Sequence, residues 1–167
     1  LGYARAFFEQ DDFDPIDASA ASFRSLTGMT ARERDAALAA GSLAFEVMDW
    51  VSERFTLPEP DILDLGHERN PVAAARMLRQ HWAIGEKPIG NMIKLLESKG
   101  ARVFSLAEDT KNVDAFSCWR NNEPYIFLNT YKSSERSRFD AAHELAHLVL
   151  HRHGGPQGRK AETEANN

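Results

Sequence analysis

The 167-residue chain contains a single cysteine, Cys118, which excludes an internal disulfide and a zinc site built from several thiolates. It also lacks any apolar run near the roughly 20 residues that a membrane-spanning helix needs. Basic residues are outnumbered, with 20 Lys and Arg against 25 Asp and Glu and a formal charge of −5. That balance argues against a chain that grips nucleic acid over its whole surface. We therefore expect a cytoplasmic protein without membrane association, since a lone cysteine suits a reducing compartment.

The remaining composition is that of an ordinary globular protein, with 43% hydrophobic and 27% charged residues. Its length suits one core, or a compact domain with a helical arm. The chain starts at Leu1 rather than Met, and Asn167 falls inside a helical pattern. We therefore expect it to be a piece of a longer protein.

The first third of the chain predicts an arm followed by a long helix. Residues 1–29 show no regular period, which favours an extended arm with local turns. Thr30 and Glu33 form a capping-box pattern, and apolar residues then recur at helical spacing to about Thr56. Pro58 and Pro60 cannot continue a helix. We therefore predict an arm and linker helix over 1–60 and the main domain over 61–167.

The main domain predicts helices, then a small sheet, then helices. Asn70-Pro71 starts a helix that runs to about Trp82, and Pro88 opens another that Gly100 closes. Three strands are expected at Arg102–Leu106, Val113–Trp119 and Pro124–Thr130, with a turn at Asn121-Asn122, followed by a helix from Ser134 to about Arg152. This order predicts an α+β fold with a small antiparallel or mixed three-stranded sheet.

The sequence His143-Glu144-Leu145-Ala146-His147 carries the clearest chemical signal. Residues four apart lie on one face of a helix, so two imidazoles at this spacing can bind one tetrahedral zinc ion. Glu144 lies beside the first ligand and can act as general base toward metal-activated water. The surrounding residues form a strongly apolar helix, as a buried metal site requires. The pattern therefore predicts a catalytic zinc site on this helix.

A third protein ligand is required, because a catalytic zinc commonly keeps three and leaves the fourth position to water. His151 lies about 12 Å along the helix axis from His143, too far for one ion to join both with His147. We expect it to end the helix or to support a ligand. We assign surface, packing or loop positions to His67, His81 and His153. A turn at Gly154–Gly158 leads into a further helix, from which Glu162 or Glu164 can return to the metal.

Several segments together resemble the ImmA/IrrE-type zinc metallopeptidases. The resemblance covers about residues 70–167. It is carried mainly by Arg138–His151, which includes the His-Glu-Leu-Ala-His run, and by Glu162-Thr163-Glu164-Ala165-Asn166. The strand Pro124–Asn129 and the segment from Pro88 to Phe104 are consistent with it.

The resemblance implies a zincin-like domain and an endopeptidase of the gluzincin type. It implies that His143, His147 and Glu162 bind zinc, that Glu144 is the general base, and that Asn166 supports a ligand histidine through a hydrogen bond. Glu164 remains the alternative third ligand. Family members often carry a helix-turn-helix DNA-binding domain ahead of this region and act on repressors or antitoxins. We therefore expect DNA contact only through such a domain, which this chain does not include.

These features lead to two hypotheses about function. The first is a zinc endopeptidase that cleaves a specific regulatory protein of the repressor or antitoxin class. Here the strand Tyr125–Asn129 would form the sheet edge for an extended substrate. Tyr125 and Tyr131 are candidate oxyanion donors, although packing roles are favoured for both. The second is a metal-binding regulatory or partner-binding module of a transcription factor with little peptidase activity, in which Lys132, Arg136 and Arg138 contribute a partner surface.

Overall fold

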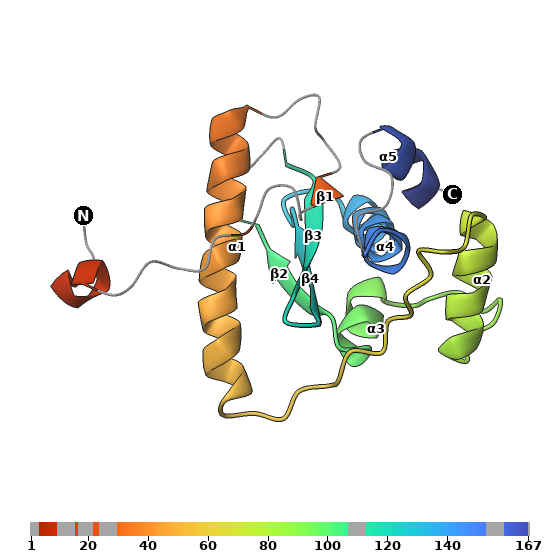
Figure 1. Ribbon diagram of the computed structural model, residues 1–167, viewed down its shortest axis with the longest axis horizontal. Helices are drawn as coiled ribbons and strands as arrows, with labels where there is room; N and C mark the ends of the chain where they lie inside the picture. Colours follow the sequence, from red (N-terminus) through yellow and green to blue (C-terminus); the bar gives the residue numbers. More distant parts are fainter. Residues whose placement is uncertain are drawn as a thin grey trace.

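A computed structural model describes residues 4–9, 16, 22–23, 30–106, 113–152 and 159–166. The described elements are a short 3-10 helix, five α-helices and four strands, in agreement with the predicted α+β class (Figure 1). Their order is η1 (Arg5–Glu9), β1 (Ser22–Phe23), α1 (Ala31–Ser52), α2 (Pro71–His81), α3 (Met92–Ser98), β2 (Arg102–Ser105), β3 (Ala115–Arg120), β4 (Glu123–Leu128), α4 (Ser134–Leu150) and α5 (Arg159–Ala165). No described helix is long and apolar enough to cross a membrane.

The sheet contains the predicted strands in a mixed arrangement, in the order β1-β3-β4-β2. β3 and β4 form an antiparallel hairpin whose turn residues, Asn121 and Asn122, have φ values of 50° and 65°. Asparagine tolerates this left-handed region better than most residues, as a tight hairpin turn requires. β2 runs parallel to β4, and the two-residue β1 adds a fourth strand, antiparallel to β3, within the predicted extended arm.

The prediction that Tyr125–Asn129 forms a sheet edge is wrong. Its strand, β4, lies between β3 and β2 and pairs with both. The outer strands of the described sheet are β2, beside β4, and the two-residue β1, which pairs with only Phe116 and Ser117 of β3.

Side-chain alternation along the strands builds a core on each face of the sheet. Phe116, Tyr125 and Phe127 face α1, and the Phe116 and Phe127 rings stack with centroids 4.4 Å apart. Ile126 and Leu128 face α3 and α4 on the other side. Figure 1 shows this layering, with α1 against one face and α2, α3 and α4 on the other side.

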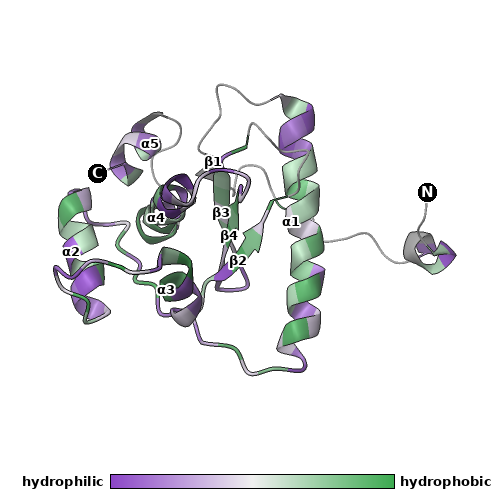
Figure 2. Ribbon diagram, turned by 180° about the vertical axis from the view of Figure 1, so that it is seen from behind, coloured by the Kyte–Doolittle hydropathy of each residue, from purple (hydrophilic) through white to green (hydrophobic). Residues whose placement is uncertain are grey.

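Helix α1 contributes to the core of the main domain. Arg120 of β3 holds the Asp49 carboxylate with nitrogen-oxygen distances of 2.6 and 2.8 Å. Hydrophobic residues cover much of α1, as Figure 2 shows, and those on one side pack on the sheet. The division of the chain at residue 60 stays a prediction, and α1 lies directly on the domain that follows it.

Asparagine side chains begin the two helices after the linker. The Asn70 side chain accepts hydrogen bonds from the amides of Val72 and Ala73, as predicted for this helix start. The next helix begins at Met92 rather than at Pro88, because Asn91 caps it by accepting a hydrogen bond from the Lys94 amide. An asparagine cap satisfies an amide that would otherwise lack a partner in the first turn.

The start of α1 provides a measurable test of helix capping. Thr30 accepts a hydrogen bond from the Glu33 amide, and Glu33 accepts one from the Thr30 amide. We expect Thr30→Ala to lower the free energy of unfolding by about 1 kcal/mol, measured by urea denaturation. Thr56→Ala, in the exposed coil after the helix, is the matched control. Equal effects of the two substitutions would contradict a specific role for the cap.

Candidate metal centre

Helix α4 carries buried polar side chains in an otherwise apolar setting. It begins where Ser133 accepts a hydrogen bond from the Arg136 amide, and it lies against β3, where the Trp119 indole donates to the Leu148 carbonyl at 3.3 Å. His143, Glu144 and His147 are exposed by only 1%, 0% and 4%. Buried polar groups at such positions require partners or a ligand.

The structure brings His143, His147 and Glu162 together. The two imidazole Nε2 atoms lie 3.0 Å apart. The Glu162 carboxylate, carried by α5, places one oxygen 3.2 Å from Nε2 of His143 and the other 3.3 Å from Nε2 of His147. All the donor atoms lie within 4.8 Å of one another, the arrangement of a possible metal site.

The separations within this donor set fit a tetrahedral metal ion. Ligands at about 2.0–2.1 Å from zinc, at tetrahedral angles, lie roughly 3.3–3.4 Å from each other. The three observed separations of 3.0, 3.2 and 3.3 Å are close to this value. Two nitrogens and one oxygen also form a ligand type that zinc accepts in catalytic sites, with the fourth position left open.

The protonation states of His147 and Glu162 also favour the binding of a cation. Burial lowers the pKa of His147, which favours the neutral imidazole. Burial alone would raise the pKa of Glu162, but hydrogen bonds from His143 and His147 outweigh it and lower that pKa to about 2. A neutral imidazole and an ionised carboxylate are the forms that bind metal, and an ion would replace the protons that the imidazoles share with Glu162.

Glu144 lies on the sheet side of α4. Its Oε2 atom accepts a hydrogen bond of 2.7 Å from the hydroxyl of Ser117, on β3. Ser117 is 2% exposed and was not singled out from the sequence. The sequence points to Ser117 only through its place in β3, where side-chain alternation puts this small polar residue on the face turned toward α4.

Residues 96–167 match the family model described as the IrrE N-terminal-like domain, a peptidase family. Over these residues, which make up less than half of the chain, the sequence is similar to this family. The match supports the resemblance seen in the sequence and covers β2, β3, β4, α4 and α5, whereas the predicted resemblance began near residue 70. The family is of the zinc metallopeptidase type, which gives the chain a metallopeptidase-type function at family level. No curated protein and no solved structure matches the chain.

Within this IrrE-like domain, His151 and Glu164 lie beside the cluster rather than in it. Nδ1 of His151 lies 2.9 Å from Nδ1 of His147. Nε2 of His151 lies 3.1 Å from Oε2 of Glu164. Among the described residues, the candidate metal cluster contains Glu162 and not Glu164.

The Asn166 side chain hydrogen-bonds within its own helix, donating to the Glu162 carbonyl at 2.7 Å. Its expected support of a ligand histidine stays a prediction. Nδ1 of His143 is buried and has no hydrogen-bond partner in the described part of the chain.

The other residues considered from the sequence lie away from the cluster. His67 is exposed in a turn, and His81 pairs with Asp61. His153 and the predicted turn at Gly154–Gly158 lie outside the described residues. Tyr125 is 1% exposed in the core on the α1 side of the sheet, and Tyr131 is 63% exposed.

The basic residues before and within the first turns of α4 make contacts inside the domain. Lys132 and Arg136 both pair with the Asp114 carboxylate. Arg138 donates to the Gly90 carbonyl at 3.0 Å. These contacts of the three basic side chains therefore help to hold α4 in place.

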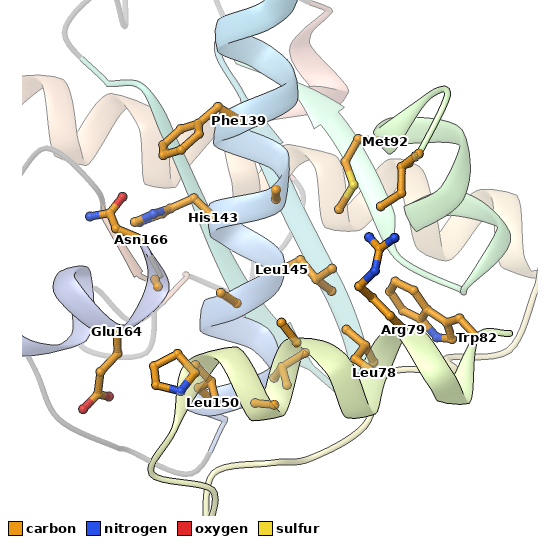
Figure 3. A pocket seen from close by; sticks show the side chains of 18 residues that line it. Leu78, Arg79, Trp82, Met92, Phe139, His143, Leu145, Leu150, Glu164 and Asn166 are labelled. Atoms are coloured by element: carbon orange, nitrogen blue, oxygen red, sulfur yellow. The ribbon is translucent and has the colours of Figure 1, made fainter. Parts of the chain in front are cut away.

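A cavity of about 300 Å³ adjoins the metal centre between α2, α4 and α5. Most of its walls are apolar, and His143, Glu164 and Asn166 are among its polar lining (Figure 3). Apolar walls next to a buried cluster would allow an apolar group to lie close to His143.

Proposed function

We propose that the chain is a zinc-dependent endopeptidase that cleaves a specific regulatory protein. The observation that carries this proposal is the donor set of His143, His147 and Glu162 at zinc-ligand separations, with Glu144 next to His143 on the same helix. The match of residues 96–167 to a metallopeptidase-type family supports the same reaction class. The repressor or antitoxin class of substrate comes from the resemblance of the sequence to ImmA/IrrE-type proteins.

The proposed role of each residue follows from the chemistry of its side chain. His143, His147 and Glu162 would hold the zinc ion, which when bound polarises a carbonyl and lowers the pKa of water. Glu144 would accept a proton on its carboxylate and return it to the leaving amine. Ser117 would hold the Glu144 side chain through the bond to Oε2.

We place the extended substrate along β3, whose Ser117 contacts Glu144. A peptide can add to a sheet edge through main-chain hydrogen bonds. β1 pairs with Phe116 and Ser117 on the side of β3 opposite β4, so a peptide that lies beside Ser117 would have to displace β1 and become the edge strand itself. The cavity next to His143 would accept an apolar side chain of the substrate.

Metal loading and removal test the proposal directly. We expect about one zinc ion per chain after zinc is supplied, measured by elemental analysis. Cleavage of a fluorogenic peptide library should stop after treatment with a chelator and return when zinc is added back. Because the proposed reaction needs the zinc ion, the rate of cleavage should follow the zinc content of the chain.

The same experiment separates the two hypotheses about function. A chain that binds no zinc would overturn the metal centre itself. A chain that binds zinc but cleaves neither the library nor an unfolded protein such as alkylated casein would favour the metal-binding regulatory module.

A further inference from the structure

Glu164, His151 and His147 form a continuous hydrogen-bonded row that ends at the metal cluster. The row runs from Oε2 of Glu164 to Nε2 of His151 over 3.1 Å, and from Nδ1 of His151 to Nδ1 of His147 over 2.9 Å. The His151 side chain is 10% exposed and that of Glu164 is 29% exposed. The row joins the end of α4 to α5.

The donors and acceptors in this row allow one consistent arrangement for a neutral His151. A carboxylate only accepts, so Nε2 of His151 carries the ring proton and donates to Glu164. Nδ1 of His151 is then an acceptor, and its partner, Nδ1 of His147, donates to it. Once a zinc ion replaces the proton between Nε2 of His147 and Glu162, that nitrogen would offer its lone pair to the ion while Nδ1 keeps its proton, which is the tautomer that metal binding requires.

We propose that His151 and Glu164 are positioning residues that set the tautomer and ring orientation of His147 for the zinc ion. The inference rests on the zinc site of the proposed function, and it does not require peptidase activity. It assigns Glu164 a role other than the alternative third ligand predicted from the sequence.

The helix end holds His151 in register with His147. The backbone amide of His151 donates to the His147 carbonyl at 2.9 Å, so the two rings lie one turn apart on the same side of α4. Their ring centroids are 5.1 Å apart. Because Nδ1 of His143 lacks such a partner among the described residues, the positioning acts on one of the two histidines.

A purely structural role, in which the row only fastens α5 to α4, predicts different results. If the role were only structural, every substitution that breaks the row would lower the stability of the chain without zinc. Whether the new side chain offers a hydrogen-bond acceptor to His147 would then make no difference. The positioning role depends on that acceptor. Asparagine can supply it, because its side-chain oxygen occupies nearly the place of Nδ1 in histidine, whereas leucine cannot.

The experiment therefore compares His151→Leu with His151→Asn. Zinc affinity is measured by competition with a chromophoric chelator, and the imidazole N–H proton of His147 is followed by NMR in the zinc-loaded chain. We expect His151→Leu to weaken zinc binding about 10–100-fold and to speed solvent exchange of that proton. His151→Asn should recover most of both losses.

Glu164→Gln and Lys160→Ala complete the series. Glu164→Gln keeps His151 in place and should weaken zinc binding less than His151→Leu does. Lys160 is exposed and lies 3.9 Å from the other Glu164 oxygen, so Lys160→Ala is the control and should leave affinity unchanged. Thermal unfolding of each metal-free variant reports any general loss of structure.

The outcomes separate this inference from the proposed function. Zinc affinity of His151→Leu within twofold of the unmodified chain, or equal losses in the leucine and asparagine variants, would overturn the positioning role. If the expected affinity pattern appears but no peptide is cleaved, the positioning role stands and the endopeptidase proposal fails. If the unmodified chain binds no zinc, both fail.

Discussion

Glu144→Gln is expected to lower the rate of peptide cleavage by about 10²–10⁴-fold while zinc content stays at the level of the unmodified chain. The loss follows from chemistry rather than from shape, because glutamine has nearly the same size as glutamate but cannot accept a proton at neutral pH. Glu144 is not one of the clustered donor atoms. Removing its charge should therefore leave the metal ligands in place.

The surroundings of Glu144 make this substitution a mild one for the fold. Its side chain is fully buried, and its Oε2 atom accepts a hydrogen bond from Ser117. The glutamine amide oxygen can accept the same bond, so the contact between α4 and β3 can survive. A substitution by alanine would instead leave a cavity and confuse loss of chemistry with loss of packing.

Glu97→Gln is the matched control, since Glu97 is exposed on α3. Cleavage rate, zinc content and thermal unfolding should be measured for both variants. Cleavage by Glu144→Gln at the rate of the control would contradict the role of Glu144 as general base. Loss of zinc together with activity would instead assign Glu144 a structural role in the site.

Most of the helices and the hairpin could be predicted because their signals are local. Thr30 and Asn70 begin helices through side-chain bonds to amides two or three residues ahead. Asn121 and Asn122 adopt the positive φ values that a short hairpin turn needs. Such signals depend on neighbours in the sequence, so a single sequence contains them.

The order of the strands could not be predicted from the same kind of signal. β2 lies beside β4, and β1 lies beside β3, through pairings that depend on packing between distant residues. Ile16, for example, is buried, and its amide donates to the Ser42 hydroxyl at 3.3 Å. A Cβ added at Gly41 would meet Cδ1 of Ile16, so the Ile16 side chain would have to shift. Nothing local in the sequence around Ile16 reveals this fit.

The candidate site likewise combines residues that a local sequence pattern predicts with residues that only the tertiary fold brings together. The spacing of His143 and His147 indicates that the two lie on one helix face, and the structure places their Nε2 atoms 3.0 Å apart. Ser117 approaches Glu144 from 27 residues away, so no motif could include it. The choice between Glu162 and Glu164 depends on how α5 folds back on α4, which neither spacing nor charge decides.

Glu162→Ala is expected to weaken zinc binding by more than the 10–100-fold range typical of residues that only support a ligand. Glu162 contributes the cluster's one carboxylate, and its oxygens lie 3.2 and 3.3 Å from the two imidazoles. Its removal leaves two protein ligands, fewer than the three that catalytic zinc sites commonly keep. Cleavage should fall with metal content and should return only in part when zinc is in large excess.

Glu164→Ala is the matched comparison, because the two glutamates lie two residues apart in α5 and differ in what they contact. Glu164 reaches His151, so its loss should weaken zinc binding by less than the loss of Glu162 does. Chelator competition on both variants, with thermal unfolding of the metal-free chains, measures the difference. The reverse order, with zinc lost from Glu164→Ala and retained by Glu162→Ala, would make Glu164 the ligand. It would also require α5 to turn, because the structure directs Glu162 toward the histidine pair.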